Sequence, residues 1–468
     1  MNKSSYKKAG SFYFIGNIFN KGISFLTVPI FTRILTTADY GIVTTYNSWI
    51  GILSMIVGFA LHMSVRMAAV DYKDDYDDFM SSIILFVTLT SFGMTTLVAG
   101  GIKLLNIDTN IILVIMCMLQ AYATATIEDY SSYLMMKYQY KARTALMILP
   151  NFISVILSVY MIKYVLESDL YMGRIISTAL VTFLFGLLIL FLALKKGKLG
   201  INKSYIKYAL AISAPLILHG IALNILSQSD RIMITYLADA AQTGIYSLIY
   251  NFSMIATVIT TTLEGIWVPW FINKLKENSR DEINVIAKDY INLMTYAMVA
   301  LILVAPEVVK VLANESYWEG ISIIPPVVLA NYVIFAYSLY VNIEHYYKKT
   351  PYITINTFIA AISNIVMNFI FIPKYGYIAA AYTTLASYLI SFVLHSQYAR
   401  KLEPNLYPLG QFSKSIIHLL TVTIIFYIFK NQFFIRWFLM VVYILSRFYK
   451  ERKRLKTYFP NITFLNGK

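Results

Sequence analysis

Long apolar stretches alternate with short polar ones along the whole chain, and this pattern predicts a membrane protein built of helices. A transmembrane helix needs about 20 mainly apolar residues, and several stretches are long enough to tilt in the bilayer. The fourteen helices that we predict span residues 11–35, 42–65, 79–101, 109–136, 144–163, 173–194, 207–232, 243–271, 285–305, 321–346, 351–372, 377–399, 412–429 and 432–447.

The second half of the chain repeats part of the first half. The segment YSSYLMMKYQYK at 130–141 resembles YSLYVNIEHYYK at 337–348, with five identical residues at a constant offset of 207. A weaker echo pairs Tyr40-Gly41 with Thr243-Gly244. Internal duplication in a membrane protein is typical of transporters that open alternately to the two sides of the bilayer.

The helix count and the repeat together predict the domain organisation. Six predicted helices precede the copy, so both halves begin on the same side of the membrane. We therefore expect an N-terminal lobe at 1–198 and a C-terminal lobe at 199–402, related by an axis along the membrane normal. Two extra helices and a basic tail follow at 403–468.

Lysine and arginine are distributed unevenly between the two sides. With the N-terminus in the cytoplasm, 29 of the 39 fall in inner segments and 9 in outer loops. This bias predicts that both termini are cytoplasmic. The basic run 447–456 either rests on anionic lipid headgroups or serves as a topology signal.

Composition supports the membrane prediction. Charged residues make up 13% of the chain and the mean hydropathy is +0.63, whereas soluble domains carry about 25% charge. A net charge of +15 would indicate nucleic acid in a soluble protein, but here the basic residues lie in loops and no nucleic-acid partner is expected. The single cysteine, Cys117, excludes disulfides and cysteine metal sites within one chain.

Charged residues inside the bilayer are costly, and they usually face protein or water. Lys21 lies about 15 Å into the first predicted helix at 1.5 Å per residue, with Asn17 one turn before it. We predict that both line a central cavity; the alternative is a structural lysine paired with a carboxylate. On the next helix, His62 and Arg66 share a face and are assigned to the same cavity. The alternative for Arg66 is that it only anchors the end of its helix.

The helix at 207–232 is the richest in polar residues. Asn224, Gln228 and Arg231 are predicted to line the cavity, and Asp230 and His219 are candidates for binding a coupling ion. An ordinary end-cap pair of Asp230 with Arg231 is the alternative. Glu264 is a further candidate for ion coupling, because a carboxylate at its depth is costly unless it is paired or protonated.

No catalytic or metal-binding constellation is present in the sequence. It contains no GxSxG, HExxH, phosphate-binding glycine loop or acidic cluster in a large outer loop. We therefore expect neither enzymatic activity nor a cofactor.

Residues 10–49 read GSFYFIGNIFNKGISFLTVPIFTRILTTADYGIVTTYNSW. With the polar Asn17 and Lys21, the run 28–35 and Asp39-Tyr40-Gly41, this segment resembles the start of bacterial O-antigen and capsule repeat-unit flippases. These flippases belong to the multidrug/oligosaccharidyl-lipid/polysaccharide exporter superfamily. The segment 264–271, with Pro269 among aromatic residues, is similar to helix 8 of that family. The resemblance extends over essentially the whole chain.

The resemblance implies that the chain carries oligosaccharide repeat units on undecaprenyl diphosphate from the inner to the outer leaflet of the bacterial cytoplasmic membrane. It also implies a cationic cavity and alternating access. The deep carboxylate of Glu264 leads us to expect coupling to a proton or Na⁺, through Glu264 or the helix at 207–232. Polysaccharide polymerase machinery is a further expected partner. The short loops favour a monomer. The alternatives are a cation-coupled drug or metabolite antiporter, whose cavity would be dominated by carboxylates, and a polysaccharide polymerase or ligase, which would carry a long outer loop.

Overall fold

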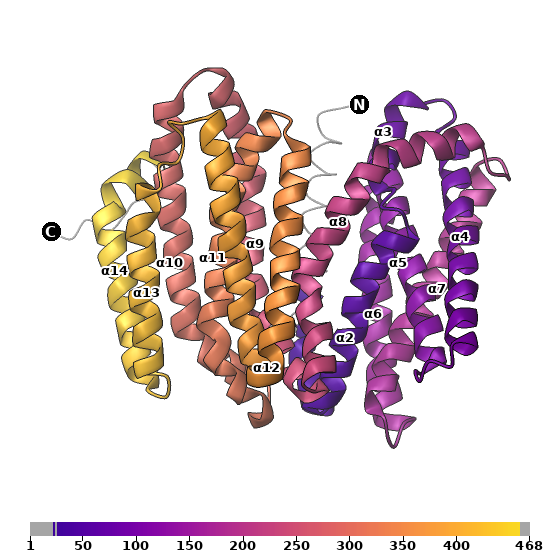
Figure 1. Cartoon of the computed structure of the whole chain (residues 1–468), viewed down its shortest axis with the longest axis horizontal. Coiled ribbons are helices and arrows are strands. Elements are labelled where there is room, and N and C mark those ends of the chain that lie inside the picture. Colours follow the sequence, from indigo (N-terminus) through magenta and orange to yellow (C-terminus); the bar gives the residue numbers. More distant parts are fainter. Residues whose placement is uncertain (1–21, 24–25, 459–468) are drawn as a thin grey trace. The chain divides into compact units, whose positions relative to one another are not determined.

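The computed structural model describes residues 22–23 and 26–458, and these residues are almost entirely helical (Figure 1). The prediction of an all-helical protein is confirmed. After a helical stretch at residues 26–34, the helices are α2 (Thr37–Val57), α3 (His62–Asp71), α4 (Tyr76–Leu104), α5 (Ile111–Met136), α6 (Tyr140–Tyr164), α7 (Leu170–Lys196), α8 (Lys203–Leu237), α9 (Ala240–Lys276), α10 (Arg280–Leu312), η1 (Glu315–Ile323), α11 (Ile324–Tyr346), α12 (Thr350–Leu402), α13 (Gly410–Ile428) and α14 (Phe433–Tyr458).

One boundary differs from the sequence-based expectation. The helix predicted at 42–65 is not continuous, because α2 ends at Val57 and α3 begins at His62. Between them Phe59 and Ala60 have positive φ angles of 55° and 47°. The helices predicted at 351–372 and 377–399 are the two parts of α12, which are separated by a kink at Gly376, a residue with non-helical backbone angles (φ 58°, ψ −145°).

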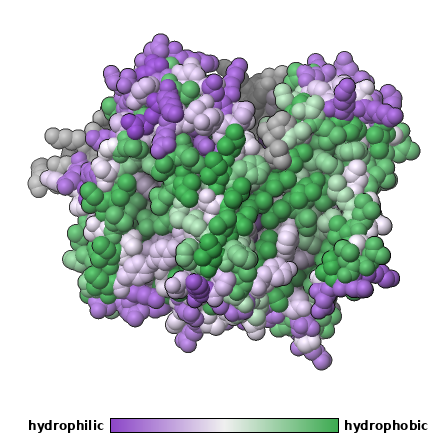
Figure 2. Space-filling model, viewed as in Figure 1, coloured by the Kyte–Doolittle hydropathy of each residue, from purple (hydrophilic) through white to green (hydrophobic). Residues whose placement is uncertain are grey.

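Ten helical segments in the described part of the chain are long and apolar enough to cross a membrane. One of them is the 53-residue α12, which contains two predicted helices. On the face shown in Figure 2, hydrophobic side chains cover the middle of the helices and hydrophilic ones gather at their ends. The helix α8 is not among the ten, which reflects the polar residues described below.

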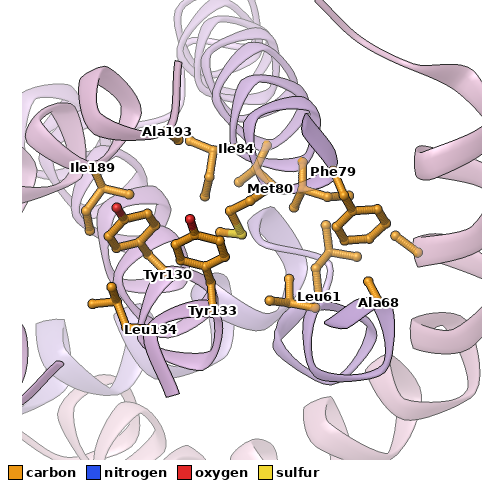
Figure 3. Packing of buried hydrophobic residues seen from close by; sticks show 14 of the residues in the cluster. Leu61, Ala68, Phe79, Met80, Ile84, Tyr130, Tyr133, Leu134, Ile189 and Ala193 are labelled. Atoms are coloured by element: carbon orange, nitrogen blue, oxygen red, sulfur yellow. The ribbon is translucent and has the colours of Figure 1, made fainter. Parts of the chain in front are cut away.

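The chain forms two compact units. Unit 1 comprises Met1–Leu248, Leu312–Tyr317 and Pro351–Ser387, and unit 2 comprises Ile249–Val311, Trp318–Thr350 and Tyr388–Lys468. These units are defined by packing and do not test the lobe boundaries at residues 198 and 402, which stay a prediction. Figure 3 shows a hydrophobic core of unit 1, to which α4, α5, α7 and the residue before α3 contribute. Its buried side chains include Leu61, Phe79, Met80, Ile84, Tyr130, Tyr133 and Ile189.

Unit 2 contains an aromatic core and several ion pairs, of which two join the ends of helices. Trp267 packs against Tyr290 with ring centroids 5.0 Å apart. At one end, both oxygens of Glu403 accept hydrogen bonds from Arg280, at 2.7 and 2.8 Å. At the start of α14, the fully buried Arg436 pairs with Glu307 of α10. These two ion pairs fix the ends of helices whose middle sections are apolar.

Within unit 1, α2 and α9 cross at positions that the sequence repeat relates to each other. A Cβ atom added to Gly41 would lie 1.7 Å from the carbonyl oxygen of Ala240, and one added to Gly244 would lie 2.0 Å from that of Thr37. Glycine is therefore required on both helices. One turn further on, Ser247 donates a hydrogen bond of 3.0 Å to Thr44. The crossing brings repeat-related residues into contact with one another.

Candidate transport site

The structure does not bring all of the residues predicted from sequence together. Asn17 and Lys21 lie outside the described residues, as does the side chain of His219. In unit 1, one group lies along α8 and another between α3 and α5. Glu264 belongs to unit 2.

Asn224, Gln228 and Arg231 lie together on the face of α8 that packs against α2. Gln228 accepts hydrogen bonds from Ser48 of α2, at 3.2 Å, and from the guanidinium of Arg231, at 3.1 Å. Gly51 of α2 lies beside this face, where an added Cβ would be in ordinary van der Waals contact with the Asn224 amide oxygen, at 3.5 Å. The structure therefore brings these three predicted cavity residues together as one polar stripe.

Asp230 points into a different polar cluster, formed by α8, α9 and α12 within unit 1. Its carboxylate is 1% exposed. One oxygen accepts hydrogen bonds from Tyr246 (2.6 Å) and Thr384 (2.5 Å), and the other accepts one from the Asn368 amide (2.7 Å). Three neutral donors thus surround a buried carboxyl group, and their hydrogen bonds offset part of the cost of burying it.

A second layer of polar groups surrounds this carboxylate. Asn368 donates to Asn364 at 3.1 Å and accepts a hydrogen bond from Thr383. Asn364 in turn accepts from Ser229, at 3.2 Å, and donates to Thr384, at 3.3 Å. The network is continuous, and a fully satisfied buried network fixes the geometry of its members. We call the set of Asp230, Tyr246, Asn364, Asn368, Thr383 and Thr384 the Asp230 network.

The alternative of an end-cap pair between Asp230 and Arg231 is wrong. The two side chains bind different partners, and α8 continues to Leu237, so both lie more than a turn before its end. Sequence reasoning identified Asp230 but missed its partners on α12. Asn364 and Asn368 stand four residues apart in an apolar helix, and this spacing, which places them on one face, was the available signal.

The other group in unit 1 lies between α3 and α5. His62 Nδ1 is 4.0 Å from the carboxylate of Glu128, and Arg66 donates to Ser132 at 3.3 Å. His62 and Arg66 therefore share a face of α3, as predicted, but that face meets α5. Asp129, the neighbour of Glu128, is buried with one carboxyl oxygen lacking a hydrogen bond. Arg66 is a cation whose hydrogen-bond partners in the described residues are neutral.

Glu264 is half-buried on α9 and has no hydrogen bond or ion pair among the residues whose positions are described. It lies near enough to Tyr290 and Tyr337 to act electrostatically on both phenols. No group of three or more His, Cys, Asp or Glu side chains is placed to hold a metal ion in the described part of the chain. The Asp230 network instead combines one carboxylate with amide and hydroxyl oxygens, the kind of oxygen ligands that hard cations take.

Solved structures of transporters share the fold of this chain. The lipid II flippase MurJ in an inward closed conformation matches with a TM-score of 0.69 and 16% identity, over 96% of this chain and 99% of that chain. An inward-facing conformation of a multidrug resistance MATE family transporter of the MOP superfamily matches with a TM-score of 0.63 and 11% identity, over 82% of this chain and 94% of that chain. An outward-facing conformation of such a transporter matches with a TM-score of 0.54 and 14% identity, over 85% of this chain and 95% of that chain.

The prediction of two six-helix lobes followed by two further helices is confirmed by this shared fold. No curated protein matches the chain. The model of the family described as "Polysaccharide biosynthesis protein" matches residues 7–274, more than half of the sequence. This multi-pass membrane protein, with the fold of the MOP superfamily, therefore belongs to the polysaccharide biosynthesis protein family.

Proposed function

We propose that this protein is a flippase that moves undecaprenyl-diphosphate-linked oligosaccharide repeat units from the inner to the outer leaflet by alternating access, for the assembly of O-antigen, capsule or exopolysaccharide. The observation that carries the proposal is the combination of this family with a fold shared, over 96% of the chain, with a lipid II flippase. That protein is named as a flippase of lipid II. The protein would act as a transporter and not as an enzyme.

The substrate that we propose explains why cations are needed in the membrane. A diphosphate cannot cross hydrocarbon unaided, and Lys or Arg side chains replace part of its hydration. We assign this role to Lys21, Arg66 and Arg231, with Asn17, His62, Asn224 and Gln228 as polar contacts for the head group. Arg231 is held by Gln228, so the amide fixes the direction of the guanidinium.

We assign ion coupling to the Asp230 network, with Glu264 and His219 as further candidates. Asp230 is deeply buried and is balanced by dipoles instead of a fixed positive side chain. A buried carboxylate without a fixed counter-ion is stabilised by binding a small cation, either a proton or Na⁺. Binding and release of that ion would bias the two states of the transporter.

The setting follows from the family and the charge distribution. We place the protein in the cytoplasmic membrane of a bacterium, as a monomer with both termini in the cytoplasm, surrounded by membrane lipids. Its product would be presented on the outer surface, where polysaccharide polymerase machinery takes it up.

Complementation of a flippase-deleted capsule or O-antigen strain tests the proposal. Wild type should restore surface polysaccharide, Lys21→Ala should fail at equal membrane abundance, and Lys21→Arg should restore part of the activity. Equal activity of Lys21→Ala would remove helix 1 from the phosphate site. Failure of the wild type with several sugar repeats, together with efflux of cationic dyes, would favour the antiporter.

A further inference from the structure

A groove lies between two membrane-spanning helices of unit 1, away from the polar groups described above. It runs beside the end of α4 and the beginning of α5 and has a volume of about 470 Å³. This volume falls within the range of about 300–1,000 Å³ that is usual for small-molecule sites. The walls are largely apolar and include Phe92, Ala99 and Gly100 from α4 and Ile111, Ile115 and Leu119 from α5.

The groove spans the depth of a single leaflet. From Phe92 to Lys103 the helix rises about 16 Å at 1.5 Å per residue, which is about half of a 30 Å hydrocarbon core. Side chains on both flanks face outward, since Leu97 is 77% exposed and Ile112 is 62% exposed. The groove therefore opens toward the hydrocarbon of the bilayer and not toward the interior of the unit.

One end of the groove carries a positive charge. Lys103 lines it in the last turn of α4, and its ammonium group has no hydrogen bond or ion pair with any described residue. A lysine at this position also offsets the helix macrodipole, but that role does not require a groove beside it. A basic side chain at the membrane surface attracts anionic lipid head groups.

We propose that this groove binds an anionic phospholipid, with one acyl chain along Ala99 and Gly100 and the phosphate at Lys103. The apolar walls of the groove and its opening toward lipid suit an acyl chain. The positive charge at one end suits the phosphate of the head group. With the predicted orientation of the chain, the site faces the outer leaflet. It is separate from the proposed transport function and does not depend on it.

Two adjacent glycines provide a matched pair of variants. A Cβ atom added to Gly100 or to Gly101 meets no atom within 4 Å, so both positions accept larger side chains. Gly100 lines the groove and Gly101 does not. Gly100→Leu should fill the groove, while Gly101→Leu adds the same side chain to the same helix outside it.

The experiment measures retention of phosphatidylglycerol and phosphatidylcholine by the purified full-length protein, using native mass spectrometry after exchange from vesicles containing equal amounts of both. Wild type and Gly101→Leu should retain phosphatidylglycerol preferentially, and Gly100→Leu should lose it. Lys103→Ala should lower the preference about five-fold, the effect of one basic side chain near the surface. Lys103→Arg should keep it, and Lys163→Ala, a change at the end of α6, should have no effect.

Three results would overturn the proposal. Equal retention of phosphatidylglycerol by Gly100→Leu and Gly101→Leu would show that the groove is not the site. Equal retention of both lipids by wild type would remove the role of the charge. Displacement of phosphatidylglycerol by an equimolar polyprenyl phosphate would assign the groove to an isoprenoid chain instead. Thermal melting curves of the variants without added lipid show whether each one is folded.

Discussion

Among single residues, Asp230 has the most unusual environment in unit 1. Burying a charge costs several kcal/mol unless it is compensated, and here the compensation comes from one phenol, one amide and one hydroxyl group. A salt bridge would neutralise the carboxylate permanently. Neutral donors instead leave its charge unbalanced, which is the condition for exchanging a small cation during a transport cycle.

Replacing Asp230 by Asn tests this argument. The amide cannot accept all three hydrogen bonds, so we expect the free energy of unfolding to fall by about 2 kcal/mol, the scale of hydrogen bonds to a charged acceptor. Stabilisation of the purified protein by Na⁺, measured as the shift in Tm, should also disappear. Asp108→Asn, in an exposed loop, is the control. An unchanged Na⁺ response in Asp230→Asn would remove this residue from coupling.

Glu403 shows a different use of a carboxylate, at the end of α12. Arg280 donates two hydrogen bonds to it and Tyr347 one of 2.5 Å. The Arg280 guanidinium, followed by the Tyr347 hydroxyl group, holds the pKa of Glu403 below its ordinary value of 4.5, against the opposing effect of burial. Because the folded-state pKa is lowered, this carboxylate stabilises the protein above pH 4.5 and ceases to do so as the pH falls through the folded-state pKa.

The difference in Tm between wild type and Glu403→Gln should therefore be largest near pH 7. It should stay constant down to about pH 4.5 and then shrink, because only then does the unfolded chain become protonated. Thermal melts of both proteins between pH 3 and pH 7, in the same detergent, measure it. A difference that is independent of pH over this range would show that the Arg280–Glu403 pair does not act through charge.

At this scale the sequence indicated which helices carry unusual residues, but not what those residues face. Asp230 and Gln228 were found because polar groups stand out in an apolar helix. Their partners were not found, because Asn368 and Thr384 of α12 and Ser48 of α2 are more than a hundred residues away in the sequence. Residue spacing defines a face of one helix, whereas the helix that covers that face is decided by tertiary packing.

At the scale of helices, α13 and α14 are the part that lies outside the internal duplication. Their attachment within unit 2 depends on Arg436, which is 1% exposed. It donates to the carbonyl oxygen of Leu303 on α10 (2.9 Å) and to that of Phe429 at the end of α13 (3.1 Å), and it pairs with Glu307. The indole of Trp437 donates to the same carboxylate at 3.2 Å. One arginine thus joins three helices.

Arg436→Met should lower the free energy of unfolding by about 3 kcal/mol, because it leaves Glu307 in a partly buried site without its counter-ion. Adding Glu307→Leu to this variant should recover most of the loss, since a buried pair can be replaced by apolar side chains of similar size. Chemical denaturation of the single and double variants measures both changes. Additive losses in the double variant would contradict the assignment of the pair as a coupled unit.

The apolar pattern predicted helices well, but it predicted only some of their interruptions. Residues 42–65 are mainly apolar, and nothing in their periodicity marks the break after Val57. A Cβ atom at Gly58 would lie 2.2 Å from that of Ala125 on α5, so close packing by another helix sets the position of the break. By contrast, the non-helical Gly376 lies in the gap between the helices predicted at 351–372 and 377–399.

For the molecule as a whole, the crossing of α2 and α9 bears most directly on alternating access. Gly41 meets the first turn of α9 and Gly244 meets the first turn of α2, so each copy of the repeat contacts the other through the same position. The hydrogen bond between Thr44 and Ser247 is neutral, and such bonds contribute about 0.5–1.5 kcal/mol net. Contacts of this strength can close one side of a transporter and still open within a cycle.

The crossing should therefore separate during transport, and a covalent link should stop it. In a Cys117→Ala background, Thr44→Cys and Ser247→Cys place two thiols where the hydroxyl oxygens are 3.0 Å apart, a spacing compatible with the Cβ separation of about 3.5–4.5 Å in disulfides. We expect oxidation to cross-link the double variant and abolish export of surface polysaccharide, and reduction to restore it. Each single cysteine variant should be insensitive to oxidant. Full export by the quantitatively cross-linked protein would mean that α2 and α9 stay together throughout the cycle, and the route across the membrane would then have to open elsewhere.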